Sequence, residues 1–481
     1  MPPVLIVSLV MSPVIYLTGR WRTVAARSLT LMGLAVLWVL WGLAAHALNT
    51  SQVLRYVQGD IVFQYDGLSQ LITVAVLLLS TLVIIFSGSD VQGCDGEEKY
   101  YAMLLLLAGA VIGLASARDL FNLWVWFELT AVSSYLLVAF YQDRIDPLAA
   151  CIKYLIQTAT GSVLVLFGIA LIFAESGSLD FTELQIAASP LILVAGVLFV
   201  IGFGVKTALV PTYTWLPDAY TQAPTGVSAL LSGIVTISGL VALLRVLAVM
   251  DGQSPLWGAV LIGFGTVNIV VGNLLALQQT VVKRIFAYSS ISHIGFVLLA
   301  IGIGIYGGQQ TGYIGGSLHL FVHALMKASA FLVIGALSHT RHQVDSSLHV
   351  SDLSGVFGRE PLLASALVIA CLSLAGMPPL AGFMSKWMIF DAGLRVGGTT
   401  MLLLVGFAAL NSVFSLAYYF PIINALFQPE RQPRNRAVPA AMRLPIIILT
   451  GAVLVVGIYP TLLDPVVGPA ARIFGALFGG H

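Results

Sequence analysis

Apolar runs of about twenty residues recur along the whole of this 481-residue chain, and that length matches the hydrocarbon thickness of a bilayer when the run is helical. Only 9% of the residues are charged and 58% are hydrophobic, against roughly 25% charged in an ordinary soluble domain. The sequence therefore predicts an all-α polytopic membrane protein rather than a soluble protein with a large core.

Charged, polar and Pro/Gly clusters divide the chain into fourteen predicted membrane helices. They cover residues 2–18, 27–48, 68–88, 101–117, 119–140, 150–174, 190–210, 226–249, 255–276, 284–306, 311–337, 361–383, 400–427 and 444–463. The stretch 176–189 is too short to span, and we expect it to lie at the membrane interface.

The basic residues predict the orientation, because cytoplasmic loops carry an excess of Lys and Arg. The odd-numbered loops between predicted helices carry fourteen of the 22 basic residues: Arg20, Arg22, Arg27, Lys99, Arg144, Lys153, Lys283, Arg284, Arg341, Arg359, Arg431, Arg434, Arg436 and Arg443. The even-numbered loops and the C-terminal tail carry five: Arg55, Arg118, Arg245, Arg395 and Arg472. We therefore expect both termini, including His481, outside an inner (plasma) membrane; an energy-converting organellar or thylakoid membrane is the alternative.

The remaining three basic residues and one carboxylate fall inside predicted spans: Glu128, Lys206, Lys327 and Lys386. An ionisable group at bilayer depth costs at least a few kcal/mol, so it usually faces the bundle interior and carries function. The structural alternative is that these are snorkelling lysines or one structural ion pair. Four such groups on four helices favour a functional role.

His319, His323 and Lys327 follow an i, i+4, i+8 spacing and share one face of the eleventh predicted helix. Neutral imidazole both accepts and donates a proton, so the face suits a water-bridged proton relay. Metal binding and ordinary buried histidines are the alternatives, but no Glu or Cys supplies a third ligand.

Two proline interruptions accompany the lysines: Pro211 follows Lys206, and Pro378 and Pro379 precede Lys386. A broken helix bearing a lysine in each half indicates paired transport sites in an internal repeat.

The segments FELTAVSSYLL, VKTALVPTYTWLPDAYTQAPTGVSALLSG, KRIFAYSSISHIGF, HLFVHALMKASAFLVIG and AGMPPLAGFMSKW resemble the antiporter-like membrane subunits of respiratory complex I, of Mrp-type cation/proton antiporters and of membrane-bound hydrogenases. The resemblance runs from about Asp66 to Asp391. It implies two inverted five-helix repeats, with the seventh and twelfth helices broken. The chain then divides into N-terminal helices (1–100), a first repeat (101–249), a second repeat (250–427) and a C-terminal helix (428–481).

The resemblance also implies site residues at matching positions. Glu128 matches the family's glutamate on the fifth helix, and Lys206 the lysine on the seventh; the remaining matches are His319, His323, Lys327 and, at the end of the twelfth segment, Lys386. We expect Glu128 to approach Lys206, directly or through water, and so to control whether Lys206 holds a proton.

One position departs from the family. Where the family has a lysine or histidine on the eighth helix, this chain has Ile237. The hydroxyls of Thr236 and Ser238 can hold water there but cannot carry the charge. The link between the two half-channels then depends on ordered water.

These features predict a proton-translocating, or cation/proton antiporting, membrane subunit of a larger energy-converting complex, surrounded by lipid and by other membrane subunits. Protons are the expected cargo, with sodium as an alternative. A non-pumping scaffold subunit is a second hypothesis, and a membrane oxidoreductase subunit is a third. The sequence has neither haem-type histidine pairs nor a Rossmann loop, and Cys94, Cys151 and Cys371 form no cluster motif. We therefore expect the chain to hold no metal and no cofactor and to carry out no redox chemistry itself. Its complex can still be an NADH:quinone oxidoreductase-type translocase. The net charge of +1 excludes a nucleic-acid-binding surface.

Overall fold

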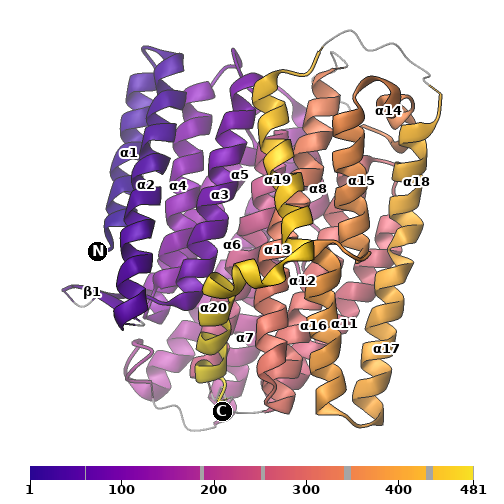
Figure 1. The fold of residues 1–481 in the computed structure, drawn as a ribbon. Coiled ribbons are helices and arrows are strands. Elements are labelled where there is room, and N and C mark those ends of the chain that lie inside the picture. Colours follow the sequence, from indigo (N-terminus) through magenta and orange to yellow (C-terminus); the bar gives the residue numbers. More distant parts are fainter. Residues whose placement is uncertain are drawn as a thin grey trace.

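The computed structural model describes residues 1–51, 53–59, 61–184, 189–250, 255–340, 348–429 and 437–479. Long helices stand side by side and make up nearly all of the described chain (Figure 1). Apolar runs fold this way because, without water, a helix satisfies its backbone groups within the segment itself. The chain is an all-α multi-pass membrane protein, as predicted.

Each predicted span corresponds to one helix or to consecutive helices. In chain order these are α1 (Pro3–Gly19), α2 (Thr23–Ser51), α3 (Gly67–Asp90), α4 (Glu97–Ser116), α5 (Leu120–Val138), α6 (Ile145–Ser176), α7 (Pro190–Thr207) with α8 (Leu216–Gln222), α9 (Thr225–Leu230) with the π-helical turn η1 (Leu231–Val235) and α10 (Thr236–Val249), α11 (Pro255–Leu277), α12 (Val282–Gly307), α13 (Gln310–His339), α15 (Pro361–Ala375) with α16 (Ala381–Val396), α17 (Thr399–Phe414) with α18 (Leu416–Phe427), and α19 (Ala440–Ile458). Within the described ranges, twelve helical stretches are long and apolar enough to cross a membrane, and α1 and α15 are shorter apolar helices.

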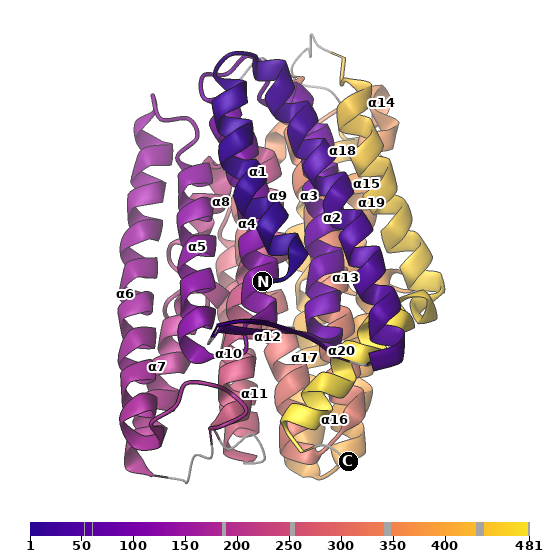
Figure 2. The same ribbon diagram turned by 90° about the vertical axis from the view of Figure 1, so that its left-hand side faces the viewer.

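The remaining elements are shorter than a membrane span. They are an antiparallel hairpin of β1 (Leu54–Gln58) and β2 (Ile61–Tyr65), in which Tyr56 faces Phe63, and the short helices η2 (Val350–Leu353), α14 (Val356–Arg359), η3 (Pro460–Leu463) and α20 (Asp464–Leu477). Figure 2 shows the hairpin running across the ends of the N-terminal helices. The stretch 176–189, in its described part, forms turns rather than a helix.

The middle of the bundle is built from helices that are buried all round. Every residue of the most apolar window is buried in Thr225–Val249 and Gln310–His339, against 22% in Val24–Ser51 and 28% in Thr399–Phe427. A helix buried on every face has no side open to lipid. Polar groups on α10 and α13 therefore have to find partners inside the protein.

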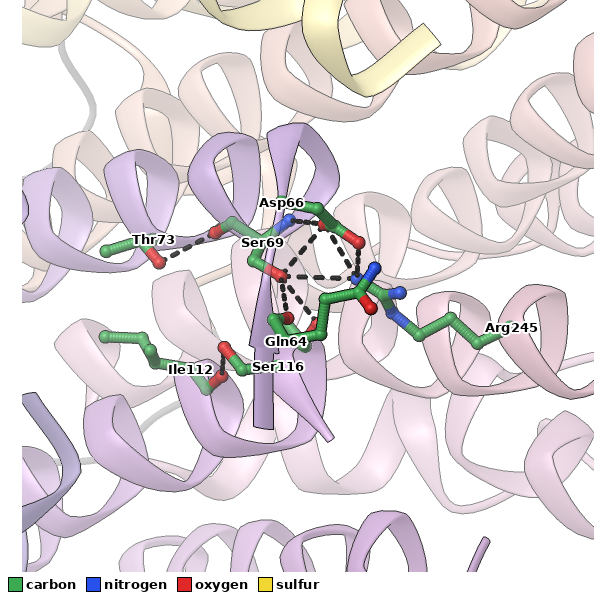
Figure 3. Close-up of polar contacts among 8 residues, drawn as sticks. Gln64, Asp66, Ser69, Thr73, Ile112, Ser116 and Arg245 are labelled. Carbon is green, nitrogen blue, oxygen red and sulfur yellow. Dashed lines mark hydrogen bonds and ion pairs between the residues drawn. The ribbon is translucent and has the colours of Figure 1, made fainter. Parts of the chain in front are cut away.

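A buried ion pair joins the first three helices to this interior. Asp66 caps the N-terminus of α3, where its Oδ1 accepts a hydrogen bond from the Ser69 backbone N–H at 2.9 Å. Arg245 Nη2 of α10 donates to Asp66 Oδ1 at 2.9 Å, to Oδ2 at 3.0 Å and to Ser69 Oγ at 3.2 Å (Figure 3). The assignment of Arg245 to a loop was therefore wrong, because its charge is neutralised inside the bundle.

A second correction concerns the twelfth predicted helix, 361–383. The helix stops at Ala375, where Gly376 takes a left-handed conformation (φ 86°), and a new helix, α16, runs on to Val396. Lys386 lies inside α16 rather than at the end of the segment. The three charged residues of α16 lower its hydropathy, which is why the sequence suggested an earlier end.

The loops with odd numbers gather at one end of the bundle, the upper end in Figure 1, which we call the basic end. Lys153 at the start of α6 and Arg284 at the start of α12 both pair there with Asp218 of α8, at 2.7 and 2.8 Å. Four of the basic residues assigned to this end, and one terminal position, lie outside the described residues: Arg341, Arg431, Arg434, Arg436 and His481.

We predict that Arg245→Met lowers the free energy of unfolding by about 3–5 kcal/mol, because the substitution leaves the Asp66 carboxylate buried without its counter-charge. The measurement is the shift of the thermal unfolding midpoint in mild detergent. Arg395→Met is the matched control: Arg395 is 60% exposed and pairs with Asp391 on the surface of α16, so its loss costs about 1 kcal/mol or less. Equal shifts for the two variants would contradict this role for Arg245.

Candidate functional site

Two membrane helices are interrupted at mid-height. α7 and α16 occupy the lower half of the bundle in Figure 1, and α8 and α15 occupy the upper half. Pro211 lies in the connection between α7 and α8, and Pro378 and Pro379 lie in that between α15 and α16. The breaks are therefore where the prolines predicted them.

The first break is held together by a neighbouring helix. Ala208 adopts a left-handed conformation (φ 60°), and the Leu209 N–H donates to the carbonyl of Gly204 at 2.9 Å. Asn268 of α11 supplies the remaining partners: its Oδ1 accepts from the Val210 N–H at 2.9 Å, and its Nδ2 donates to the Ala208 carbonyl at 3.2 Å. Irregular backbone at membrane depth is tolerated when other helices satisfy it in this way.

Lys206 lies in the last turn of α7 and is fully buried. Its Nζ donates to the backbone carbonyl of Phe127 at 3.1 Å and lies 4.8 Å from the centre of the Phe127 ring. A cation is favoured at the C-terminal end of a helix dipole and over an aromatic face. On the other side, a Cβ on Gly239 of α10 would come within 3.0 Å of Lys206 Cβ, so α10 packs closely on the lysine.

Glu128 is half-buried on α5, directly after the residue that binds Lys206. Its Oε1 is buried and accepts no hydrogen bond. Among the ion pairs of the described residues, which are those with N–O distances of at most 4.0 Å, there is none between Glu128 and Lys206. A direct contact is therefore absent from this conformation, and the water-bridged contact stays a prediction.

Lys386 repeats the arrangement of Lys206 at the second break. Its Nζ donates to the carbonyl of Leu374, in the last turn of α15, and to Ser412 Oγ, both at 2.8 Å. The ammonium also lies 4.7 Å from the centre of the Phe296 ring. Each lysine at a break thus lies against a backbone carbonyl, the end of a half-helix and an aromatic face.

The predicted face of α13 is completely buried. Lys327 Nζ donates to the Phe286 carbonyl at 2.8 Å and to Ser289 Oγ at 2.6 Å, and Ser289 is hydrogen-bonded to the Tyr419 hydroxyl. Both ring nitrogens of His323 are buried without a partner. Such groups inside a bundle are where ordered water is expected, since buried polar atoms seldom stay unpaired.

One residue of this site was missed by the sequence analysis. His293 of α12 places Nδ1 3.1 Å from His319 Nε2, and His319 Nδ1 lies 2.8 Å from Ser385 Oγ, one residue before Lys386. The His293 ring centre is 5.4 Å from that of His323. His293 could have been found, because it lies within a segment predicted to span the membrane. In the described part of the chain, no three His, Cys, Asp or Glu residues are arranged to hold a metal ion.

Comparison with known proteins identifies the architecture. Residues 117–412 match the family described as NADH:quinone oxidoreductase/Mrp antiporter, transmembrane. The chain belongs to this family. It is 33% identical to NADH-quinone oxidoreductase subunit N of Deinococcus radiodurans over 448 residues, which is 90% of this chain and 88% of that relative.

Solved structures agree with this assignment. A chain of respiratory complex I from Thermus thermophilus with bound aureothin is 30% identical with a TM-score of 0.79, covering 96% of this chain and 98% of that one. A chain of the Mrp complex from Dietzia sp. DQ12-45-1b is 25% identical with a TM-score of 0.84, covering 100% of both.

The departure from the family's sequence pattern lies on α10, the helix that packs on Lys206. Ile237 is buried and apolar, and the hydroxyls of Thr236 and Ser238 donate to the backbone of their own helical segment, at Ser232 O and Val235 O.

Other polar groups, which the sequence analysis did not single out, lie beside this region. Ser232 Oγ of the π-helical turn lies 3.1 Å from Ser290 Oγ of α12, one turn before His293. The Tyr220 hydroxyl is buried without a partner. This antiporter-family chain thus offers hydroxyls, in place of a charged base, between its two halves.

We predict that Asn268→Leu destabilises the protein, because it leaves the Ala208 carbonyl and the Val210 N–H without a hydrogen-bond partner. Each unpaired backbone group should lower the free energy of unfolding by about 1–3 kcal/mol. The unfolding midpoint in mild detergent measures the effect. Asn49→Leu, on an exposed position of α2, is the matched control and should leave the midpoint nearly unchanged. A neutral Asn268→Leu would show that the break does not depend on α11.

Proposed function

We propose that this chain is a proton-translocating membrane subunit of a multi-subunit energy-converting complex. The observation that carries the proposal is the set of buried ionisable side chains on α7, α12, α13 and α16: Lys206, His293, His319, His323, Lys327 and Lys386. Burying so many ionisable groups costs too much to be retained for stability alone. The respiratory complex I and Mrp assemblies named above support membrane subunits as its partners.

Lys206 and Glu128 form the proposed switch in the first half. The Lys206 ammonium is held by a carbonyl and not by a carboxylate, so its charge lacks a full counter-ion. The unpaired Oε1 belongs to Glu128, the residue after Phe127. A small movement or a bridging water would bring this carboxylate close enough to stabilise the Lys206 ammonium. Protonation of Lys206 then depends on a motion that a partner subunit can drive.

The second half provides the proposed relay. A proton on His319 can pass through Ser385 toward Lys386, because imidazole and hydroxyl groups both accept and donate. Moving one charge against the membrane potential costs about 2.3 kcal/mol per 100 mV. The driving free energy therefore has to come from redox chemistry in partner subunits or from an opposing gradient of protons or sodium.

We predict that Lys206→Ala and His293→Phe each reduce proton transport by the assembled complex by about tenfold or more, since each removes a group that has to hold the proton in passing. Transport is followed with a pH-sensitive dye in vesicles, normalised to the amount of assembled complex. His46→Phe, on an exposed position of α2, is the control for His293→Phe. Normal transport by Lys206→Ala would favour the scaffold hypothesis.

The proposed orientation places the basic end in the cytoplasm of a cell inner membrane, with both termini outside. Trp21 is 85% exposed in the loop after α1, at the basic end, and Val57 is 68% exposed in β1, at the opposite end. In intact cells we expect Val57→Cys to react with an impermeant thiol reagent, whereas Trp21→Cys should react only after permeabilisation. The reverse pattern would invert the topology.

A further inference from the structure

A cavity of about 420 Å³ lies at the basic end, between the start of α12, the short helix η2 and α18. Its lining residues are Leu277, Gln279, Thr280, Ile285, His349, Val350, Ser351, Ala417, Tyr418 and Pro421. The rim is exposed and polar at Thr280 and His349, whereas Ile285 and Tyr418 are buried and form the inner wall. The cavity therefore leads from the loop surface into the bundle.

The inner wall is connected to the central lysine by hydroxyl groups. The Tyr418 hydroxyl donates to Asn273 Oδ1 at 2.9 Å, and the Tyr418 ring lies against that of Tyr419, with the ring centres 4.5 Å apart. Tyr419 is hydrogen-bonded to Ser289, whose Oγ accepts from Lys327 Nζ at 2.6 Å. The hydroxyls of Tyr419 and Ser289 thus lead from the residue beside the cavity wall to Lys327.

We propose that this cavity is a water-filled entrance through which protons from the basic end reach Lys327 without passing Lys206. Its volume is enough for several waters, and Gln279, Thr280, His349 and Ser351 supply polar groups within an otherwise largely apolar lining. A proton from water at the Tyr418 hydroxyl is accepted by the neighbouring Tyr419 hydroxyl, whose own proton passes to Ser289, and Ser289 gives its proton to the neutral amine of Lys327. The number of protons is conserved, and no oxidant or reductant takes part.

This entrance rests on the proposed function and extends it. Any path from Lys206 toward α13 has to do without a charged base at Ile237, which is buried on α10. With a second entrance, Lys327 is loaded from the same end of the molecule whether or not that path conducts. The second half of the chain then works as a complete half-channel of its own, ending at Lys386.

Filling the cavity tests the proposal. Ala417→Trp places a large side chain in the cavity from an exposed position of α18, and we expect proton transport by the assembled complex to fall about tenfold. Leu410→Trp is the matched control, because Leu410 is 72% exposed on α17 and does not line the cavity. Tyr418→Phe, which keeps the ring and removes only the hydroxyl, should slow transport in the same direction.

The outcomes separate this proposal from the function on which it rests. If Lys327→Ala abolishes transport while Ala417→Trp and Tyr418→Phe leave it unchanged, the entrance is wrong and the function stands. If Lys327→Ala also leaves transport unchanged, the proposed function fails with it.

Chemical labelling tests the hydration directly. In the whole complex, with Cys94 replaced by serine, we expect Ala417→Cys to react with a small charged methanethiosulfonate reagent supplied from the basic end. Reaction only with a lipid-soluble maleimide would make the cavity a groove for acyl chains and overturn the proposal. Reaction with the charged reagent only from the opposite end would overturn it as well.

Discussion

Every backbone donor and acceptor at bilayer depth needs a partner within the protein, and the two broken helices are where this requirement shapes the molecule most strongly. At the first break Asn268 reaches across from α11 to bind both sides of the interruption. At the second, Ser373 Oγ accepts from the Gly382 N–H at 3.1 Å, and Ser412 Oγ donates to the Ala375 carbonyl at 3.0 Å. Without these neighbours, each half-helix end would expose unpaired groups.

The same breaks create the sites for charge. A half-helix that ends inside the bundle presents the negative end of its dipole there, and Lys206 and Lys386 lie at those ends with aromatic faces beside them. Neither ammonium is paired with a carboxylate among the described residues, in contrast to Arg245, which Asp66 neutralises. The lysines are thus held by backbone carbonyls and a hydroxyl, whereas the arginine is held by a carboxylate as a structural charge.

Much of the site could be predicted from single residues. Glu128, Lys206 and Lys327 were found because a charge within an apolar run is rare and expensive, and the prolines located both breaks. Lys386 was found but misplaced, because the charges of α16 ended the apolar run before the helix ended. His293 was missed although it lies within a predicted span. The Ser232–Ser290 contact was missed because a serine inside a span carries no comparable signal until its neighbours are known.

The sequence by itself determined the fold class, the number and approximate limits of the membrane helices and the presence of interior charges, because hydropathy and charge act locally along the chain. The tertiary structure decided which groups meet. The contact of His293 with His319 and the contacts from Tyr419 through Ser289 to Lys327 join different helices. Glu128 and Lys206, in contrast, form no direct ion pair. Such contacts depend on how the helices pack, and no local sequence pattern determines which face of one buried helix contacts another.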